Sequence, residues 1–318
     1  MGSPFDGLQA GISVVVVVGD RRDRAQRMLA ALAAQTACDR LEIILVDASS
    51  NGAPALSSPP EPKVRRIRAK PGIMPGRARF MGAEIAQAPW VAFLEDHCYP
   101  EPGWAAAILA AHREGWTAVG YSFINGSPDT YLFRSIFLAE YGPWAHPQPG
   151  GAAVHLPGSN VSYQRSALMR FGERLSDLLE VDYALHESLR NEGASFCTAA
   201  GALVAHESYA RFRDLLYAHF LFCRLQAARR AQAFAWPFRR RLAISLAAPI
   251  ALPALQLFRA WKVFRRHRLL TAWLAAIPVI YAIHQAEAIG ESLGLLLGAG
   301  ESPRRFAPLE LNSRRAAG

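Results

Sequence analysis

A run near the start of the chain, Ile12–Val18, is β-branched at every position except Ser13 and is followed by a Gly-Asp pair. An apolar run of this length is typical of a central parallel strand that is buried on both faces. A helical pattern follows over Arg24–Gln35, and Leu41–Val46 then forms a second apolar run that ends at Asp47. Strand, helix and strand in this order predict a βαβ unit with a right-handed crossover. The chain should therefore build an α/β sheet.

Another apolar run, Pro89–Leu94, delivers two carboxylates and an imidazole at its end, in Glu95, Asp96 and His97. Pro100 then breaks the pattern, so a short buried strand should end here. In an open α/β sheet, ligands bind at the carboxyl ends of the strands. A divalent metal such as Mg²⁺ or Mn²⁺ would satisfy the crowded side chains. The alternative is a solvated acidic turn.

Two loops could approach a ligand. The turn-rich basic segment Lys70–Arg79 leads into a helix that we expect to reach about Gln87. Basic side chains beside a helix N-terminus can hold a diphosphate, although a solvated basic loop has the same composition. The stretch Gly158–Tyr163, which contains Asn160, could let a sugar approach the backbone. A plain tight turn explains it equally well.

Two later positions end or begin predicted elements. Asp182 lies on a mostly helical pattern, Ser176–Gly193, in what should be the N-terminal turn of a helix. A carboxylate is favoured there as a structural cap. His206 follows the strand pattern Ala199–Ala205. A lone histidine at a strand end is more often a structural residue than a ligand.

The composition limits the partners. The chain has 318 residues, 51% of them hydrophobic, and a formal net charge of +9. This charge indicates an anionic partner, and no nucleic-acid-binding motif accompanies it. Four widely spaced cysteines indicate reduced thiols in the cytosol. The first ten residues contain no basic region before the apolar run, so we expect no cleavable signal peptide and a catalytic part on the cytoplasmic side.

The composition changes after about Tyr209. Two apolar segments, Leu242–Phe258 and Leu269–Ala286, are at the short end of what crosses a bilayer. The loop between them is strongly basic, which opposes a simple two-pass anchor under the positive-inside rule. We therefore expect helices that lie in or re-enter an anionic membrane surface. A soluble helical subdomain with a buried hairpin remains the alternative.

The segments Gly76–Gly82, Phe93–His97 and Pro100–Trp104, in this order, resemble the family 2 glycosyltransferases. The resemblance covers about Ile12–His206. It implies the GT-A fold, with a mixed, mostly parallel sheet, flanking helices and a C-terminal helical region. We expect a nucleotide-sugar-binding catalytic domain over residues 1–208 and a membrane-associating region over 209–318.

The family also implies an inverting transfer of a sugar from a nucleoside-diphosphate sugar, with a divalent metal, to a hydroxyl acceptor. Because the C-terminal region should hold the site at a membrane, we expect that this acceptor could be lipid-linked or part of a cell-envelope glycan. The resemblance favours UDP and leaves GDP and dTDP open. It assigns Asp182 as the catalytic base. It assigns donor binding to Asp47, Arg79, Glu95 and Asp96, to which we add Asn160, and metal binding to Asp96, His97 and His206.

Several positions depart from the family pattern. Phe80 stands where asparagine is usual, Val181 replaces the acid that commonly precedes the base, and His97 replaces a third acid. These departures leave open a catalytically inactive, membrane-bound scaffold that binds a nucleotide. A soluble transferase is a third interpretation. No Gln-x-x-Arg-Trp element follows Asp182, so the chain does not resemble a processive polysaccharide synthase.

Overall fold

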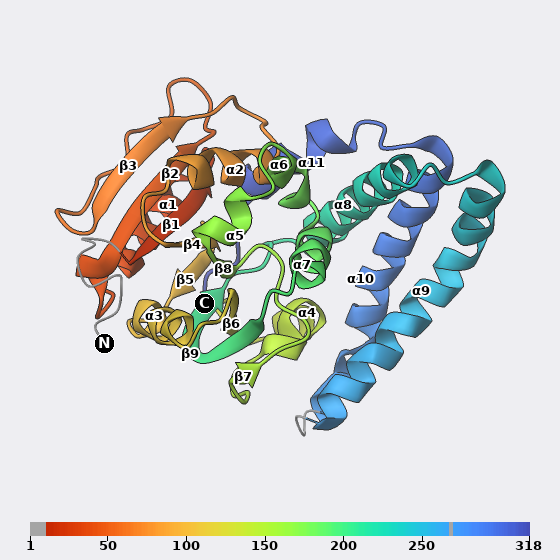
Figure 1. Ribbon diagram of the computed structural model, residues 1–318. Coiled ribbons are helices and arrows are strands. Elements are labelled where there is room, and N and C mark those ends of the chain that lie inside the picture. Colours follow the sequence, from red (N-terminus) through yellow and green to blue (C-terminus); the bar gives the residue numbers. More distant parts are fainter. Residues whose placement is uncertain (1–10, 267–269) are drawn as a thin grey trace. The chain divides into compact units, whose positions relative to one another are not determined.

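The computed structural model describes residues 11–266 and 270–318 (Figure 1). The chain divides into two compact units: Met1–Ile124 with His146–His206, and Asn125–Ala145 with Glu207–Gly318. The segment used for the signal-peptide prediction, residues 1–10, lies outside the described residues, as do residues 267–269, which include Arg268 of the basic loop.

The first unit is built on a nine-stranded mixed sheet (Figure 1). Its strands are β1 (Ile12–Val18), β2 (Leu41–Asp47), β3 (Lys63–Arg68), β4 (Trp90–Glu95), β5 (Cys98–Pro100), β6 (Ala118–Asn125), β7 (Gly151–Ala152), β8 (Val161–Gln164) and β9 (Phe196–His206). They follow the order β3-β2-β1-β4-β8-β6-β9-β5, and β7 pairs with β9. A mixed sheet with flanking helices is the fold class that the sequence predicts.

The register of the parallel strands brings the predicted site to one edge. Strand β1 pairs in parallel with β2 and β4, and all seven of its residues are buried. Val18 is opposite Asp47 on β2, and Val17 is opposite Glu95 on β4. The carboxyl ends of β1, β2 and β4 therefore lie side by side, which is where open α/β sheets bind ligands. Beyond β4 the pairs with β8 are antiparallel.

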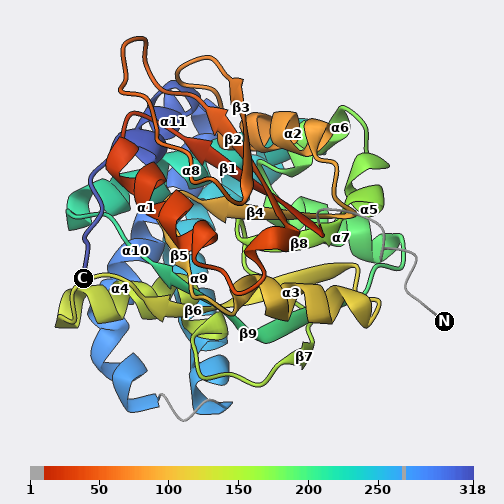
Figure 2. The same cartoon turned by 90° about the vertical axis from the view of Figure 1, so that its left-hand side faces the viewer.

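Helices flank this sheet (Figure 2). They are α1 (Arg22–Ala33), η1 (Cys38–Arg40), α2 (Pro75–Ile85), α3 (Trp104–Arg113), α5 (Arg165–Met169), α6 (Arg174–Leu178) and α7 (Asp182–Asn191). Helix α2 approaches β1 closely, because a Cβ atom on Gly82 would lie 2.3 Å from Cγ1 of Val15. Phe80 of the same helix is 2% exposed. The unusual residue at position 80 is thus part of the core.

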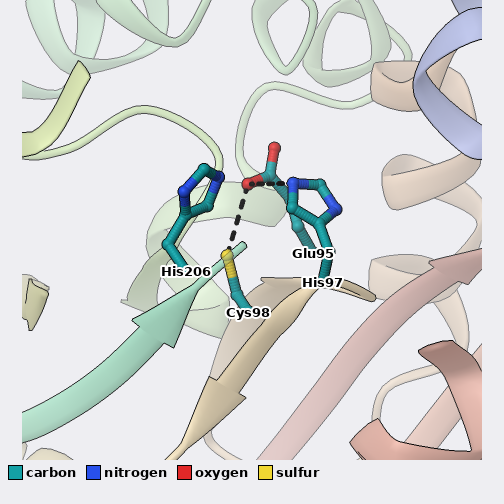
Figure 3. A group of neighbouring side chains, drawn as sticks. All are labelled: Glu95, His97, Cys98 and His206. Carbon is teal, nitrogen blue, oxygen red and sulfur yellow. Dashed lines mark hydrogen bonds and ion pairs between the residues drawn. The ribbon is translucent and has the colours of Figure 1, made fainter. Parts of the chain in front are cut away.

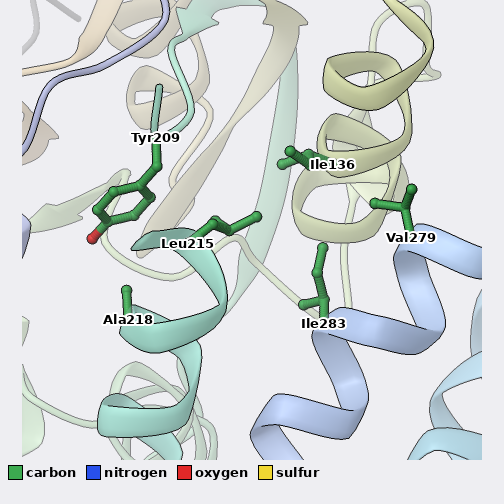
Figure 4. Packing of buried hydrophobic residues seen from close by; sticks show 6 residues of the cluster. All are labelled: Ile136, Tyr209, Leu215, Ala218, Val279 and Ile283. Carbon is green, nitrogen blue, oxygen red and sulfur yellow. The ribbon is translucent and has the colours of Figure 1, made fainter. Parts of the chain in front are cut away.

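The second unit is helical. It contains α4 (Tyr131–Tyr141), η2 (Gly142–Trp144), α8 (Phe212–Ala233), α9 (Phe238–Arg266), α10 (Leu270–Leu297) and α11 (Ser302–Asn312). Buried residues of α4, α8 and α10 form one of its cores, in which Ile136, Leu215 and Ile283 take part (Figure 4). Helix α10 also lies close to α8, because a Cβ atom on Gly290 would be 2.3 Å from the carbonyl oxygen of Phe220.

Two helices of this unit are long and apolar enough to cross a membrane, by length and composition: Phe238–Lys262 of α9 and Leu270–Leu297 of α10. Both contain proline. Large apolar side chains are exposed along α9, including Leu246 at 71% and Ile250 at 79%. Length and composition alone are weak evidence that these helices cross a membrane, because core helices of soluble proteins can have the same length and composition.

Hydrogen-bonded histidine and glutamate side chains connect helices α8, α10 and α4 of the helical unit. Nδ1 of His219, on α8, lies 2.9 Å from Glu287 on α10, and its Nε2 lies 3.2 Å from Glu140 on α4. His284 lies 2.7 Å from the other oxygen of Glu287. Burial lowers the pKa of His219, but the hydrogen bonds to Glu140 and Glu287 outweigh it and raise this pKa to about 10.

We expect the free energy of unfolding to depend on pH through His219. An unfolded histidine has a pKa near 6.5, so the extra stability is fully present below about pH 6.5 and is lost as the pH rises towards 10. The loss should be of order 2–4 kcal/mol, measured by urea unfolding over this pH range. The His219→Gln variant should lose this slope, and the exposed His155→Gln control should keep it. Parallel pH profiles for wild type and His219→Gln would contradict the assignment.

Candidate active site

Four side chains gather beyond the end of β4, and each offers one atom that can bind a metal (Figure 3). Glu95 ends β4, His97 lies in the tight turn that follows, Cys98 begins β5 and His206 ends β9. Their ligand atoms all lie within 4.8 Å of one another. The structure thus brings together His97 and His206, the two imidazoles that the sequence proposes as metal ligands.

The group is buried except at its carboxylate. Cys98 is fully buried, whereas Glu95 keeps 25% of its side chain exposed. Oε2 of Glu95 lies 3.6 Å from Sγ of Cys98 and 3.8 Å from Nε2 of His97. The rings of His97 and His206 meet edge to face, with their centroids 5.1 Å apart. Two imidazoles, a thiol and a carboxylate form a donor set that fits a divalent metal.

Asp96, which the sequence proposes as a metal ligand, is not a member of this group. Its carboxylate forms an ion pair with Arg24 of α1 at 2.9 Å, and the two side chains are only 3% and 2% exposed. Oδ1 of Asp96 also lies 3.3 Å from Nδ1 of His97. A carboxylate on one ring nitrogen fixes the orientation of a histidine whose other nitrogen faces a metal. The geometry therefore favours Glu95 over Asp96 as the carboxylate ligand.

Asn160, proposed from the sequence to bind the donor, is 1% exposed and hydrogen-bonded to Glu95. Its Nδ2 donates to Oε2 of Glu95 at 2.7 Å, and its Oδ1 accepts from the backbone N–H of Glu95 at 3.1 Å. The first bond fixes the Glu95 carboxylate of the metal-binding group, and the second fixes the backbone of the same residue. The amide thus acts on Glu95, a role that the sequence did not indicate.

Asp47 lies at the end of β2, among basic residues. Arg22 of α1 forms two hydrogen bonds with its carboxylate, at 3.1 and 2.6 Å, and Arg68 of β3 lies 3.4 Å away. Burial opposes the ionisation of Asp47, but the hydrogen bonds from Arg22 and Ser49 outweigh it and lower its pKa. Asp47 is therefore an ionised carboxylate between two arginines, at the sheet edge where the sequence proposes that a nucleotide binds.

Asp182 is the first residue of α7, and Arg79 of α2 pairs with it. Nη1 of Arg79 lies 3.2 Å from Oδ1 of Asp182, and its Nη2 donates to Oγ of Ser159 at 2.8 Å. Burial raises the pKa of Asp182, and the opposing effects of Arg79 and Ser159 do not cancel this. Burial lowers the pKa of Arg79, but the charges of Asp182 and Glu95 outweigh it and raise this pKa, which links the pair electrostatically to the metal-binding group. Asp182 is accordingly a stronger base than an ordinary aspartate.

The N-terminus of α2, where the sequence suggests a diphosphate, is filled by Glu180. Its Oε1 accepts from the backbone N–H groups of Gly76 at 2.7 Å and Arg77 at 3.2 Å. A carboxylate in this position satisfies the free donors of the helix and its dipole. Glu180 thus occupies the backbone donors at which the sequence suggests a diphosphate, and it ties the segment before Asp182 to α2.

Sequence reasoning missed three residues of this site. Cys98 carried a signal, because it follows His97 directly and a thiol is a metal ligand. Arg24 and Glu180 carried none, because their partners lie 72 and 104 residues away along the chain.

Comparisons with known proteins identify the family and the fold. The sequence model described as Glycosyl transferase family 2 matches residues 13–172. The structure resembles a mannosyltransferase, PcManGT from Pyrobaculum calidifontis, solved in complex with GDP-Man and Mn²⁺. The identity is 16%, the TM-score is 0.57, and the match covers 91% of this chain and 88% of that one.

A weaker match is GalNAc-T7 with UDP, GalNAc and Mn²⁺, at 15% identity and a TM-score of 0.45, over 63% of this chain and 44% of that one. No curated protein sequence matches significantly. The likeness to PcManGT at 16% identity shows a shared GT-A fold.

Proposed function

Since the chain belongs to glycosyl transferase family 2, we propose that it is a membrane-associated, inverting glycosyltransferase. It moves a sugar from a nucleoside-diphosphate sugar to a hydroxyl acceptor, which we propose is lipid-linked or part of a cell-envelope glycan. The observation that carries the proposal is the pairing of Arg79 with Asp182 beside the group of Glu95, His97, Cys98 and His206, all in the first unit. This unit is proposed as the catalytic domain.

Donor binding is proposed for the carboxyl edge of the sheet. Glu95, His97 and His206 would hold a divalent metal, which when bound neutralises charge on the departing diphosphate. Arg79 supplies a second positive charge for the same diphosphate. Asp96 orients His97 through Nδ1, and Asn160 orients Glu95.

Proton removal is proposed for Asp182. A transfer with inversion needs a base that takes the proton from the acceptor hydroxyl as this oxygen attacks the anomeric carbon. The raised pKa of Asp182 suits it to this role. Its contacts with Arg79 and Ser159 hold the carboxylate in one orientation, so that the base is positioned before the acceptor arrives.

Membrane association is proposed for α9 and α10. Exposed apolar side chains run along α9, and cations lie beyond both ends of this stretch, at Arg239–Arg241 and at Lys262 and Arg265. Cations at both ends favour helices that lie in or re-enter an anionic surface over a simple two-pass anchor. The contacts of His219 with Glu287 and Glu140 support an in-plane or re-entrant arrangement, because they hold the second half of α10 against α8 and α4.

Calorimetry of the detergent-solubilised protein tests the proposal. UDP, GDP and dTDP are titrated with and without Mn²⁺ into wild type, into Glu95→Gln and into the exposed Glu101→Gln control. We expect one nucleotide to bind wild type and the control in a metal-dependent manner, with binding to Glu95→Gln at least tenfold weaker. Slow hydrolysis of the matching nucleotide sugar should accompany binding.

Two outcomes would contradict the proposal. Folded protein that binds none of the three nucleotides would exclude a nucleotide-sugar transferase. Metal-dependent binding with an intact nucleotide sugar after prolonged incubation would instead indicate an inactive nucleotide-binding scaffold.

A further inference from the structure

Cys98 is fixed in the metal-binding group by the sheet. Strands β5 and β9 pair antiparallel, with Cys98 opposite His206 and Tyr99 opposite Ala205. Residues directly opposite each other in an antiparallel pair project to the same face, with their Cβ atoms about 5 Å apart. The thiol and the imidazole of His206 are therefore held on the same side by strand register, as Figure 3 shows.

The thiol also faces the carboxylate of the group. Sγ of Cys98 donates to Oε2 of Glu95 at 3.6 Å, and this same oxygen lies 3.8 Å from Nε2 of His97. Glu95 is held in turn by Asn160 at 2.7 Å. Three of the four ligand atoms are nitrogen or sulfur, and one is oxygen.

This donor set discriminates between metals. Mg²⁺ prefers oxygen ligands and retains several waters, so a thiol adds little to its binding. Zn²⁺ and Co²⁺ bind thiolate and imidazole well, and sulfur, imidazole nitrogen and carboxylate oxygen are all ligands that zinc accepts. Coordination requires the thiolate, so the thiol proton leaves to solvent when the metal binds.

We propose that Cys98 is a direct metal ligand, and that it makes this site selective for thiophilic divalent ions such as Zn²⁺ or Co²⁺ over Mg²⁺. The inference rests on the proposed function only in placing a metal beside the donor diphosphate. A buried cysteine that acts as a small apolar residue is the alternative. Cys197 of β9 has that character: it is 2% exposed, and burial, together with the charge of Glu114, raises its pKa to about 12.

The test is absorption spectroscopy of full-length, metal-stripped protein titrated with Co²⁺. Thiolate bound to Co²⁺ gives a near-ultraviolet charge-transfer band that oxygen and nitrogen ligands do not give. We expect this band in wild type and in Cys197→Ser, and its loss in Cys98→Ser and Cys98→Ala. Zn²⁺ should abolish the band stoichiometrically, and excess Mg²⁺ should not. Cys98→Ser should weaken Zn²⁺ binding roughly 100-fold and Mg²⁺ binding less than about threefold.

Three results would overturn the inference: wild type with no charge-transfer band, a band that persists in Cys98→Ser, or equal loss of Zn²⁺ and Mg²⁺ affinity in that variant. The wild-type spectrum decides the first point even if the variants fold poorly. Nucleoside diphosphate binding is measured on the same samples. If the protein binds a nucleotide but shows no charge-transfer band, this inference alone is wrong. If it shows the band but binds no nucleotide, the proposed function alone is wrong.

Discussion

Replacing Asp182 with asparagine is expected to lower kcat about 10²–10⁴-fold, the usual contribution of a general base. Asparagine keeps the size of the side chain and an oxygen for Arg79, which now lies 3.2 Å from the carboxylate, but it cannot accept a proton. Donor binding measured by calorimetry should therefore change little. The control is Glu187→Gln, an exposed acid on the same helix α7. A kcat within about threefold of wild type would place the base elsewhere.

The same residue predicts the acid limb of the pH profile. A base works only when deprotonated, and burial raises the pKa of Asp182 above that of an ordinary aspartate. The rate should therefore fall as the pH drops through this raised pKa, at a higher pH than for an unperturbed carboxyl group. The Asp182→Asn variant should lack this limb, and Glu187→Gln should retain it.

Replacing Arg24 with methionine is expected to lower the free energy of unfolding by about 3–5 kcal/mol, because it removes the buried ion pair that balances the charge of Asp96. The double variant Arg24→Met/Asp96→Asn should recover a large part of this loss, since the charge is then removed. Urea unfolding of the detergent-solubilised chain measures both. The control is Arg134→Met, whose side chain is 62% exposed and whose partner Asp129 is 80% exposed, and which should cost less than about 1 kcal/mol.

An Arg24→Met variant within about 1 kcal/mol of wild type would contradict this reasoning. It would mean that water or a movement of the turn after β4 relieves the charge of Asp96. The stability of the double variant distinguishes burial of the charge from loss of the arginine's own packing. If the double variant is as unstable as the single one, packing is the cause.

Local periodicity was enough for much of the fold. Ile12–Val18 matches β1 in both bounds, and Leu41–Val46 ends one residue before the end of β2. Each of these segments satisfies its pattern within a few residues of chain. Periodicity does not predict to which unit a segment belongs. Helix α4 belongs to the helical unit, although the segments before and after it in the chain belong to the first unit.

The site was predictable only where its chemistry lies on neighbouring residues. Glu95 and His97 indicate a ligand site in the sequence, because they belong to three polar residues that directly follow one buried strand. The pairing of Asp96 with Arg24, and of Glu180 with the N-terminus of α2, depends on how distant segments pack. Both pairings place a charge where the sequence alone suggested a ligand.

The pairing of Cys98 with His206 also limits which insertions and deletions the metal-binding group can tolerate. Side chains alternate between the faces of a strand, so shifting β9 by one position would carry the imidazole to the opposite face. A single-codon insertion or deletion that shifts β9 in this way would therefore remove His206 from the group without altering any of the four side chains. Point substitutions can weaken this group by degrees, whereas a change of chain length by one residue abolishes it in a single step.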